Sequence, residues 1–338
     1  MNAPIRPPGT GPQQAATALQ ELSRALLALT GLAHGNRPHA LLADAMQVLR
    51  GLVPFDAAWW GEVSQGGAGD APRTWLHGSI GLSRGFADEW NQLAVADDFA
   101  RHSMQRLGTV IREHEAPVTH ADAQTLIAFS ERHGLRRCMA TTVELPRSGL
   151  LFFISLYRPE TQPPFSDAQA LLLGEFTRHL LCHWSHALQR WAPGSAQHLW
   201  DSYALAEPGG ALLFAGLRMG QALAEAYPDW PGDALPDDLR QSAARLPCTV
   251  APAAGRHRFR LEACGPLVAV SLPSRGAGSP LAPREMSAAT LYAHGQSYKD
   301  IAATLGLSPA TVRTYLRSAY AALGVRNKTE LVAALRRG

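Results

Sequence analysis

The stretch SYKDIAATLGLSPATVRTYLRSAYAALG, residues 297–324, decides the fold of the C-terminal end because helix-terminal signals follow one another along it. Ser297 stands three residues before Asp300, which is the spacing of a capping box at a helix start. Gly306 can adopt the left-handed conformation that ends a helix, and Ser308-Pro309 then offers a hydroxyl cap followed by a proline at the first helical position. The sequence therefore predicts two helices split by a short turn, the helix-turn-helix plan.

Helical spacing separates a buried face of these two helices from an outward one. The apolar positions recur at three- and four-residue steps, at Val312, Leu316, Ala319, Tyr320 and Leu323 on the second helix and at Ile301, Ala302 and Leu305 on the first. Thr314 and the pair Arg313 and Arg317 are left facing outward. The two arginines are four residues apart, so they lie one above the other on the helix. An arginine can bond bidentately to guanine in the major groove, which suits a helix that reads DNA.

Across residues 281–338 the chain resembles the LuxR-type helix-turn-helix domain of bacterial transcription factors. The positions that carry the resemblance are Leu281, Pro283, Arg284, Glu285, Gly295, Lys299, Ile301, Ala302, Leu305, Ser308, Thr311, Val312, Leu316, Leu323, Gly324, Val325, Thr329 and Glu330. Ala282, Ala288 and Ala289 depart from the family's pattern, and they weaken the expected capping and packing of the first helix. The resemblance implies a four-helix domain with double-stranded DNA as its partner.

The resemblance also assigns roles to outward side chains of this domain. It implies that Arg313, Thr314 and Arg317 face the bases. It further implies contacts to phosphates by Lys299, Thr311, Tyr315 and Lys328.

Charge is distributed unevenly along the 338 residues. Residues 281–338 hold eight Lys and Arg against three Asp and Glu, and subtracting these from the chain's 31 and 28 leaves 23 against 25 for residues 1–280. A basic end on a mildly acidic body is typical of one nucleic-acid-binding module joined to a non-binding partner.

Several classes of site are excluded by residue usage. The four cysteines are scattered, without the close pairs of a zinc ribbon or a disulfide framework. Lys299 and Lys328 are the only lysines, so residues 1–280 hold no P-loop or Schiff-base lysine and no lysine of a phosphoacceptor receiver domain. Catalytic motifs, a signal-peptide core and an apolar run long enough to span a bilayer are also missing from the sequence. We therefore expect a cytoplasmic, non-enzymatic protein with no cofactor and no membrane partner.

Residues 17–192, after a loose tail at 1–16, predict an α+β sensor domain. Helices are expected at 19–32, 41–49, 83–108 and 121–134, strands at 55–63, 73–80, 109–112, 138–145 and 150–157, and a long helix from Asp167 to Trp191. Trp59 and Trp60 should face opposite sides of their strand. This order, with Phe165-Ser166-Asp167 opening the long helix, resembles a GAF-type domain or the related ligand-binding domain of LuxR-type receptors.

Residues 197–273 predict a smaller domain that resembles a shortened PAS-like domain. A hairpin is expected from Tyr203–Ala206 and Leu212–Ala215, then a helix at 217–227. Residues 256–261 alternate with period two and are expected to pair with 267–272, so that the arginines form the wet face of the strand. Residues 274–280 read as a flexible linker. The predicted fold class is thus multidomain α+β, with antiparallel-sheet sensor domains followed by an all-α helix-turn-helix domain.

A small-molecule pocket is the first candidate site in the sensor half. Such pockets are apolar and aromatic with a few polar anchors, and Trp59, Trp75, Trp90, Asp97 and Phe152 can line one. The alternative interpretation is that these aromatic residues simply fill a core. Lactone receptors of the family carry a Trp, Tyr and Asp-Pro constellation in this region. Ala94 and Asp98 depart from it, so a lactone effector is not expected.

The long helix carries the second candidate, a stripe of metal-ligand types at His179, Cys182, His183 and His186. A metal- or haem-dependent redox sensor is therefore one alternative function. An amphipathic helix with a polar side gives the same pattern. Its apolar side, from Phe176 to Leu188, is expected to pair with a second chain, since helix-turn-helix proteins commonly bind DNA as dimers. A regulator that works through protein partners without any ligand is the remaining alternative.

Overall fold

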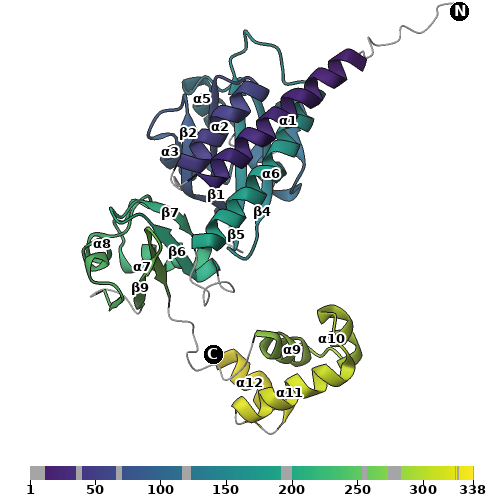
Figure 1. The fold of residues 1–338 in the computed structure, drawn as a ribbon, viewed down its shortest axis with the longest axis vertical. Coiled ribbons are helices and arrows are strands. Elements are labelled where there is room, and N and C mark those ends of the chain that lie inside the picture. Colours follow the sequence, from purple (N-terminus) through teal and green to yellow (C-terminus); the bar gives the residue numbers. More distant parts are fainter. Residues whose placement is uncertain are drawn as a thin grey trace, which may run out of the picture. The chain divides into compact units, whose positions relative to one another are not determined.

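The computed structural model describes residues 12–35, 40–65, 71–115, 123–191, 200–252, 257–272, 283–323, 325 and 327–337 (Figure 1). The chain divides into two compact units, Met1–Leu272 and Pro273–Gly338. The expected linker at 274–280 and residues 1–11 of the expected tail lie outside the described residues, as does Gly324. The described remainder of the tail, residues 12–16, is helical rather than loose. Within the described part, no helix is both long and apolar enough to cross a membrane.

The first unit contains two five-stranded antiparallel sheets. The first sheet has the order β2-β1-β5-β4-β3 and is built from β1 (Ala57–Ser64), β2 (Arg73–Ile80), β3 (Val110–Arg112), β4 (Arg137–Leu145) and β5 (Leu150–Arg158). On one face lie α1 (Pro12–His34), α2 (Leu41–Leu52) and α6 (Asp167–Trp191) (Figure 1). The other face carries α3 (Phe86–Leu93), α4 (Asp98–Gln105) and α5 (Ala123–Arg132), and a 3-10 turn at Glu113–Glu115 follows β3. The predicted α+β class is confirmed.

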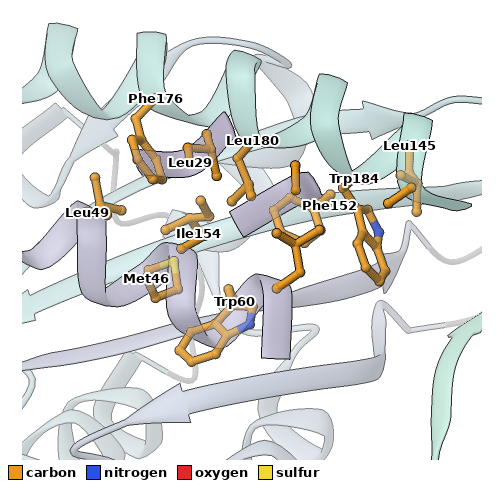
Figure 2. Packing of buried hydrophobic residues seen from close by; sticks show 14 of the residues in the cluster. Leu29, Met46, Leu49, Trp60, Leu145, Phe152, Ile154, Phe176, Leu180 and Trp184 are labelled. Atoms are coloured by element: carbon orange, nitrogen blue, oxygen red, sulfur yellow. The ribbon is translucent and has the colours of Figure 1, made fainter. Parts of the chain in front are cut away.

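Alternation along β1 and β5 gives the first sheet its two cores. Trp59 belongs to the cluster beneath α3–α5, and Trp60 belongs to the cluster beneath α1, α2 and α6, as predicted. Figure 2 shows the second cluster, in which Phe176 and Leu180 of α6 point toward Ile154 of β5. Full burial of each such side chain contributes about 1.5–3 kcal/mol, so this face anchors the domain.

Two expectations for the sensor half are wrong. The single helical stretch at 83–108 is two helices, because Asp97 has an extended backbone and caps α4 by accepting a hydrogen bond from the Ala100 N–H. Contrary to expectation, the apolar side of α6 is not exposed for pairing with a second chain. Its members Phe176, Leu180, Trp184 and Leu188 are each at most 4% exposed, because the protein's own sheet covers them.

The second sheet has the order β7-β6-β10-β9-β8. Its elements are β6 (Tyr203–Ala206), β7 (Leu212–Ala215), β8 (Cys248–Val250), β9 (Phe259–Cys264) and β10 (Leu267–Ser271), with α7 (Leu217–Ala226), α8 (Asp237–Ser242) and 3-10 turns at Trp200–Ser202 and Ala243–Arg245. The predicted strand at 256–261 starts at Phe259 and continues to Cys264, which pairs with Leu267 across a tight turn. Arg258 and Arg260 are exposed on either side of buried Phe259, as the alternation predicts.

The second unit is a four-helix domain of α9 (Pro283–Ala293), α10 (Tyr298–Leu305), α11 (Pro309–Leu323) and α12 (Lys328–Arg337). Ser297 and Asp300 form the predicted capping box, and Gly306 ends α10 with a φ of 63°. The Ser308 hydroxyl accepts a hydrogen bond from the Thr311 N–H at the start of α11. A small core closes the domain around Ile301, Val312, Leu316 and Leu331. Ala288 and Ala289 are fully buried within this core, so their small side chains let α9 pack closely.

Candidate ligand cavities and nucleic-acid interface

Asp97 and Trp90 are brought together beneath α3 and α4. The Trp90 Nε1–H donates to Asp97 Oδ2 over 2.8 Å, and the Ala100 N–H donates to Asp97 Oδ1 over 2.9 Å. Burial raises the pKa of the Asp97 carboxyl, while these hydrogen bonds oppose the rise. Both carboxyl oxygens are thus engaged by the protein itself, and Asp97 fixes the junction between the two helices.

A cavity of about 360 Å³ opens beside this junction, between the first sheet and α3–α5. We call it the α3–α5 cavity. Its lining includes Trp90, Leu126, Phe129, Cys138 and Tyr157. Burial raises the pKa of both the Cys138 thiol and the Tyr157 hydroxyl well above their ordinary values, so both groups are neutral at physiological pH. The cavity is therefore mainly apolar, with the neutral Cys138 and Tyr157 at its wall, and Asp97, Asp98, Glu113 and Arg136 also line it.

The five residues expected to line one pocket are divided between the faces of the first sheet. Trp90 and Asp97 line the α3–α5 cavity, and Trp59 closes a gap of about 50 Å³ between them and the sheet. Trp59, Trp75 and Phe152 together line a larger hollow of about 640 Å³, along β2 and near β7 of the second sheet. The division arises because Phe152 lies on the α6 face of β5, opposite the α3–α5 face.

We call this hollow the edge groove, since β2 and β7 are edge strands of their sheets. Its lining includes Trp59, Trp60, Glu62, Trp75, His77, Gly78, Arg84, Asp88, Phe152, Trp184 and Asp233. Glu62 is only 3% exposed, and burial raises the pKa of its carboxyl well above the ordinary value. Our sequence reasoning missed this residue. One sequence feature could have indicated it: Glu62 is the only charged residue in the strand AAWWGEVS, and it stands among buried positions.

The stripe of metal-ligand types on α6 does not converge on a site. Cys182 and His186 are exposed, and the His183 Nε2 lies 3.4 Å from the Thr30 hydroxyl of α1. Across the described part of the chain, no group of three or more His, Cys, Asp and Glu side chains is arranged to hold a metal ion. Desolvation and the neighbouring His179, His34 and His186 lower the pKa of His183. These histidines therefore form a polar outer surface of α1 and α6.

The helix-turn-helix presents the side chains that were expected to meet DNA. Arg313, Thr314 and Arg317 are exposed on α11, whereas Val312 and Leu316 between them are buried. Of the expected phosphate contacts, Lys299 and Lys328 are exposed and Thr311 and Tyr315 are half-buried.

Arg313 and Lys328 each lie close to the ring of a tyrosine, and the two tyrosine rings stack on each other. Tyr292 and Tyr298 stack with their centroids 5.5 Å apart and their planes 8° from parallel. The Arg313 guanidinium lies 5.5 Å from the Tyr298 centroid, and the Lys328 ammonium lies 4.6 Å from that of Tyr292. The stack therefore gathers positive charge from α11 and α12 onto one side of the domain.

Comparison with known proteins agrees with this arrangement. Residues 279–335 match the family described as bacterial regulatory proteins, luxR family. Mb0914c of Mycobacterium bovis, named an HTH-type transcriptional regulator, is 48% identical over 67 residues, which are 20% of this chain and 8% of that protein. The transcriptional regulatory protein UhpA of Escherichia coli is 44% identical over 66 residues, which are 20% of this chain and 33% of that protein. The chain thus matches a third or less of each relative's length.

Solved structures overlap with a larger share of the chain. Escherichia coli SdiA covers 93% of this chain and 96% of its own, with a TM-score of 0.39 and 13% identity. The ligand-binding domain of VqsR from Pseudomonas aeruginosa covers 51% of this chain and 96% of its own, with a TM-score of 0.36 and 17% identity. The family match is confined to the four-helix unit, where geometry and sequence coincide. That C-terminal unit is a DNA-binding helix-turn-helix domain of the luxR family of bacterial regulatory proteins.

Proposed function

We propose that the chain is a bacterial transcriptional regulator in which the first unit senses a signal and the helix-turn-helix unit binds operator DNA. The observation that carries this proposal is the outward display of Arg313, Thr314 and Arg317 on α11 of a luxR-family domain. A helix with this surface can enter the major groove, with its arginines at base edges. Lys299, Thr311, Tyr315 and Lys328 would then contact phosphates, which position the domain without reading sequence.

The regulator acts as a homodimer on two half-sites in this proposal. One recognition helix contacts only a short stretch of DNA, and a dimer doubles the contacts and sets the half-site spacing to about 34 Å, one turn of the duplex. The buried side of α6 is not available for pairing, so the interface lies elsewhere. Exposed apolar side chains on α1, Leu19 at 67% and Leu27 at 70%, offer one surface that a second copy would cover.

A small apolar effector is proposed to bind in the α3–α5 cavity. The cavity's aromatic walls and uncharged Cys138 and Tyr157 suit a molecule with few polar groups. A ligand screen that follows the unfolding temperature of the full chain tests this step. Failure of every compound to stabilise the wild type, together with unaltered operator binding, would instead favour a regulator that works through protein partners alone.

DNA recognition is tested by selecting duplexes with the full-length wild type and measuring the selected site against variants. Arg317→Ala should weaken specific binding about 5- to 150-fold, the effect of one lost bidentate contact, and should relax base preference at one position. Lys328→Ala should weaken binding to all sequences alike and reduce its salt dependence. Arg284→Ala, an exposed arginine on α9, is the matched control.

The same binding experiment reports on the dimer through the number of chains bound per duplex. An Arg317→Ala variant with wild-type affinity and base preference would remove α11 from its proposed role. A single chain bound to a single half-site would contradict the dimer while leaving the role of α11 intact.

A further inference from the structure

The edge groove has a buried carboxyl group at its wall with one oxygen that lacks a hydrogen-bond partner. Glu62 lies on β1 on the same side as Trp60, and it is directly opposite Phe152 of β5 in the sheet register. Its carboxyl accepts a hydrogen bond from the Ala215 N–H of β7, so it reaches from the first sheet to the second. Its Oε2 atom is buried and has no hydrogen-bond partner. A buried polar atom without a partner costs about 1–3 kcal/mol, so the groove is built to receive something that this oxygen can bind.

Indole rings line the same groove as this oxygen. Trp59, Trp60, Trp75 and Trp184 all line the groove, together with the Phe152 ring. Two of these rings, those of Trp60 and Trp75, pack closely against glycines. The Trp60 ring lies so close to Gly78 that a Cβ added there would be 2.4 Å from it, and a Cβ on Gly220 of α7 would be 2.5 Å from the Trp75 ring. Trp faces attract cations more strongly than the other aromatic rings do, and a wall of several indoles with one acid is the composition that binds organic ammonium groups.

The charge of the groove has the sign that such a ligand requires. Three carboxyl groups, those of Glu62, Asp88 and Asp233, line it together with a single guanidinium, that of Arg84. His77 also faces the groove. Desolvation lowers its pKa, although Asp88 and Asp233 oppose this change, so the ring is largely neutral near pH 7. Asp88 and Asp233 already outnumber the one base before Glu62 ionises, so the hollow concentrates cations rather than anions.

A bare metal ion fits this groove poorly. No set of three or more His, Cys, Asp and Glu side chains in the described residues is arranged around a metal position. The groove around Glu62 is lined largely by aromatic rings, and indoles do not ligate divalent cations. The lining suits a cation that carries its own apolar body.

We propose that the edge groove binds a small protonated organic amine, with its ammonium group on Glu62 and its apolar body against the indole rings. The ammonium donates a hydrogen bond to Oε2, while the other contact of the carboxyl, from the Ala215 N–H, is kept. In the complex the amine keeps its proton and Glu62 is ionised, any proton that it held having passed to solvent, so the pair in the groove is carboxylate and ammonium. No bond is made or broken beyond this proton release.

The bound amine would join the two halves of the first unit. The groove takes walls from β1 and β2 of the first sheet, from Leu212 of β7 in the second sheet and from Asp233. A ligand there contacts both sheets, and among the described residues the groove shares only Phe86 with the lining of the α3–α5 cavity. The proposal therefore does not depend on DNA binding or on an effector in that cavity.

The test uses the full-length protein with 2-phenylethylamine as probe and 2-phenylethanol as its uncharged counterpart. All eight tryptophans precede residue 231, so tryptophan fluorescence, excited selectively over tyrosine, reports on the first unit alone. The amine should change the fluorescence saturably at pH 7 and the alcohol should not. Titration calorimetry in two buffers of different ionisation enthalpy should detect a proton released on binding.

Glu62→Gln keeps the side-chain shape and an acceptor for the Ala215 N–H but removes the charge. It should bind the amine about 10- to 150-fold more weakly, the effect of losing one hydrogen bond to a charged group, and should release no proton. Glu144→Gln, on an exposed position of β4 in the same sheet, is the matched control and should bind like the wild type.

Two outcomes overturn the proposal. One is equal binding of amine and alcohol, which makes the groove a general apolar site. The other is no saturable response to the amine in a wild type and a Glu62→Gln variant that both unfold cooperatively, which leaves the groove as a water-filled gap between the sheets. Either result leaves the role of α11 untouched, because operator binding is measured separately.

Discussion

Two buried carboxyl groups lie near opposite faces of the first sheet, and the protein treats them differently. Asp97, beneath α3 and α4, accepts hydrogen bonds from the Trp90 indole and from backbone N–H groups at the start of α4. Glu62, on the α6 face, receives one backbone hydrogen bond and has a second oxygen without a partner. Burial raises the pKa of both groups.

This difference distinguishes a carboxyl group that holds the fold together from one that can bind a ligand. An acid whose oxygens are all engaged positions the elements around it and has little left to offer a ligand. An acid with a free buried oxygen destabilises the empty protein, and a ligand can relieve that cost. The aspartate that the sequence suggested as a ligand anchor is thus better understood as a helix cap, while the overlooked glutamate has the properties of an anchor.

The largest expected effect on stability comes from replacing the ionisable carboxyl of Glu62 by an amide. Its pKa in the folded protein lies well above the ordinary value of 4.5, so between these two values the folded state binds more protons than the unfolded state. Stability should therefore fall as pH rises through this window, by about 1.4 kcal/mol per pH unit for this one group. Glu62→Gln removes that loss. The free energy of unfolding can be measured by urea titration with tryptophan fluorescence as the signal. Relative to the wild type, that of Glu62→Gln should increase with each pH unit across this window.

The difference between the two proteins isolates Glu62, because other groups titrate in both. His183, whose pKa is lowered, contributes stability in the opposite direction, since its folded state binds fewer protons than the unfolded chain. Parallel pH profiles for wild type and Glu62→Gln would mean that Glu62 is ionised in the folded protein, and the contrast with Asp97 would disappear.

Removing the Asp97 side chain should destabilise the protein, in contrast to Glu62→Gln. Asp97→Ala deletes the cap of α4, which costs about 0.5–2 kcal/mol, and leaves the Trp90 N–H without its partner, which costs about 1–3 kcal/mol. We expect a loss of about 2–4 kcal/mol in the free energy of unfolding at pH 7, measured by the same urea titration. Glu144→Ala, on an exposed position of β4, should change it by less than about 0.5 kcal/mol. A comparably small loss for Asp97→Ala would mean that α3 and α4 hold together without it.

Local signals explain which parts of this fold the sequence predicts. The capping box at Ser297, the φ of 63° at Gly306 and the alternation of Trp59 and Trp60 each depend on residues that are close along the chain. The four-helix unit consists almost wholly of such signals, so its helices follow from sequence nearly residue by residue. Its DNA-facing roles remain predictions until the variants are measured.

The ligand sites depend on contacts between distant residues. Glu62 and Ala215 are far apart in the sequence, and no local pattern brings the edge of β7 to β1. Trp75 and Phe152 looked like partners of Trp90 because all are aromatic, but the sheet divides them. The alternation along a strand predicts which face of the sheet a residue lies on. Which residues it contacts there depends on how the second sheet packs against the first.

The smallest effects in this comparison are expected from two helical glycines, one behind the edge groove and one far from it. A Cβ at Gly220 would lie 2.5 Å from the Trp75 ring, whereas a Cβ at Gly31 of α1 would meet nothing within 4 Å. Gly220→Ala should therefore force the indole to shift, at a cost of about 1–3 kcal/mol. Gly31→Ala should stabilise the unit by about 0.5–1 kcal/mol, because alanine loses less conformational freedom in a helix than glycine does.

Opposite signs for these two alanines, measured by urea unfolding, would establish that Trp75 is held firmly against α7. The shifted indole should also weaken binding of 2-phenylethylamine, while Gly31→Ala should leave it unchanged. Stabilisation by both substitutions would mean that Trp75 moves aside without cost, and a wall that yields so easily could not hold a ligand against Glu62. The rigidity of this wall is therefore what separates a built site from a gap between two sheets.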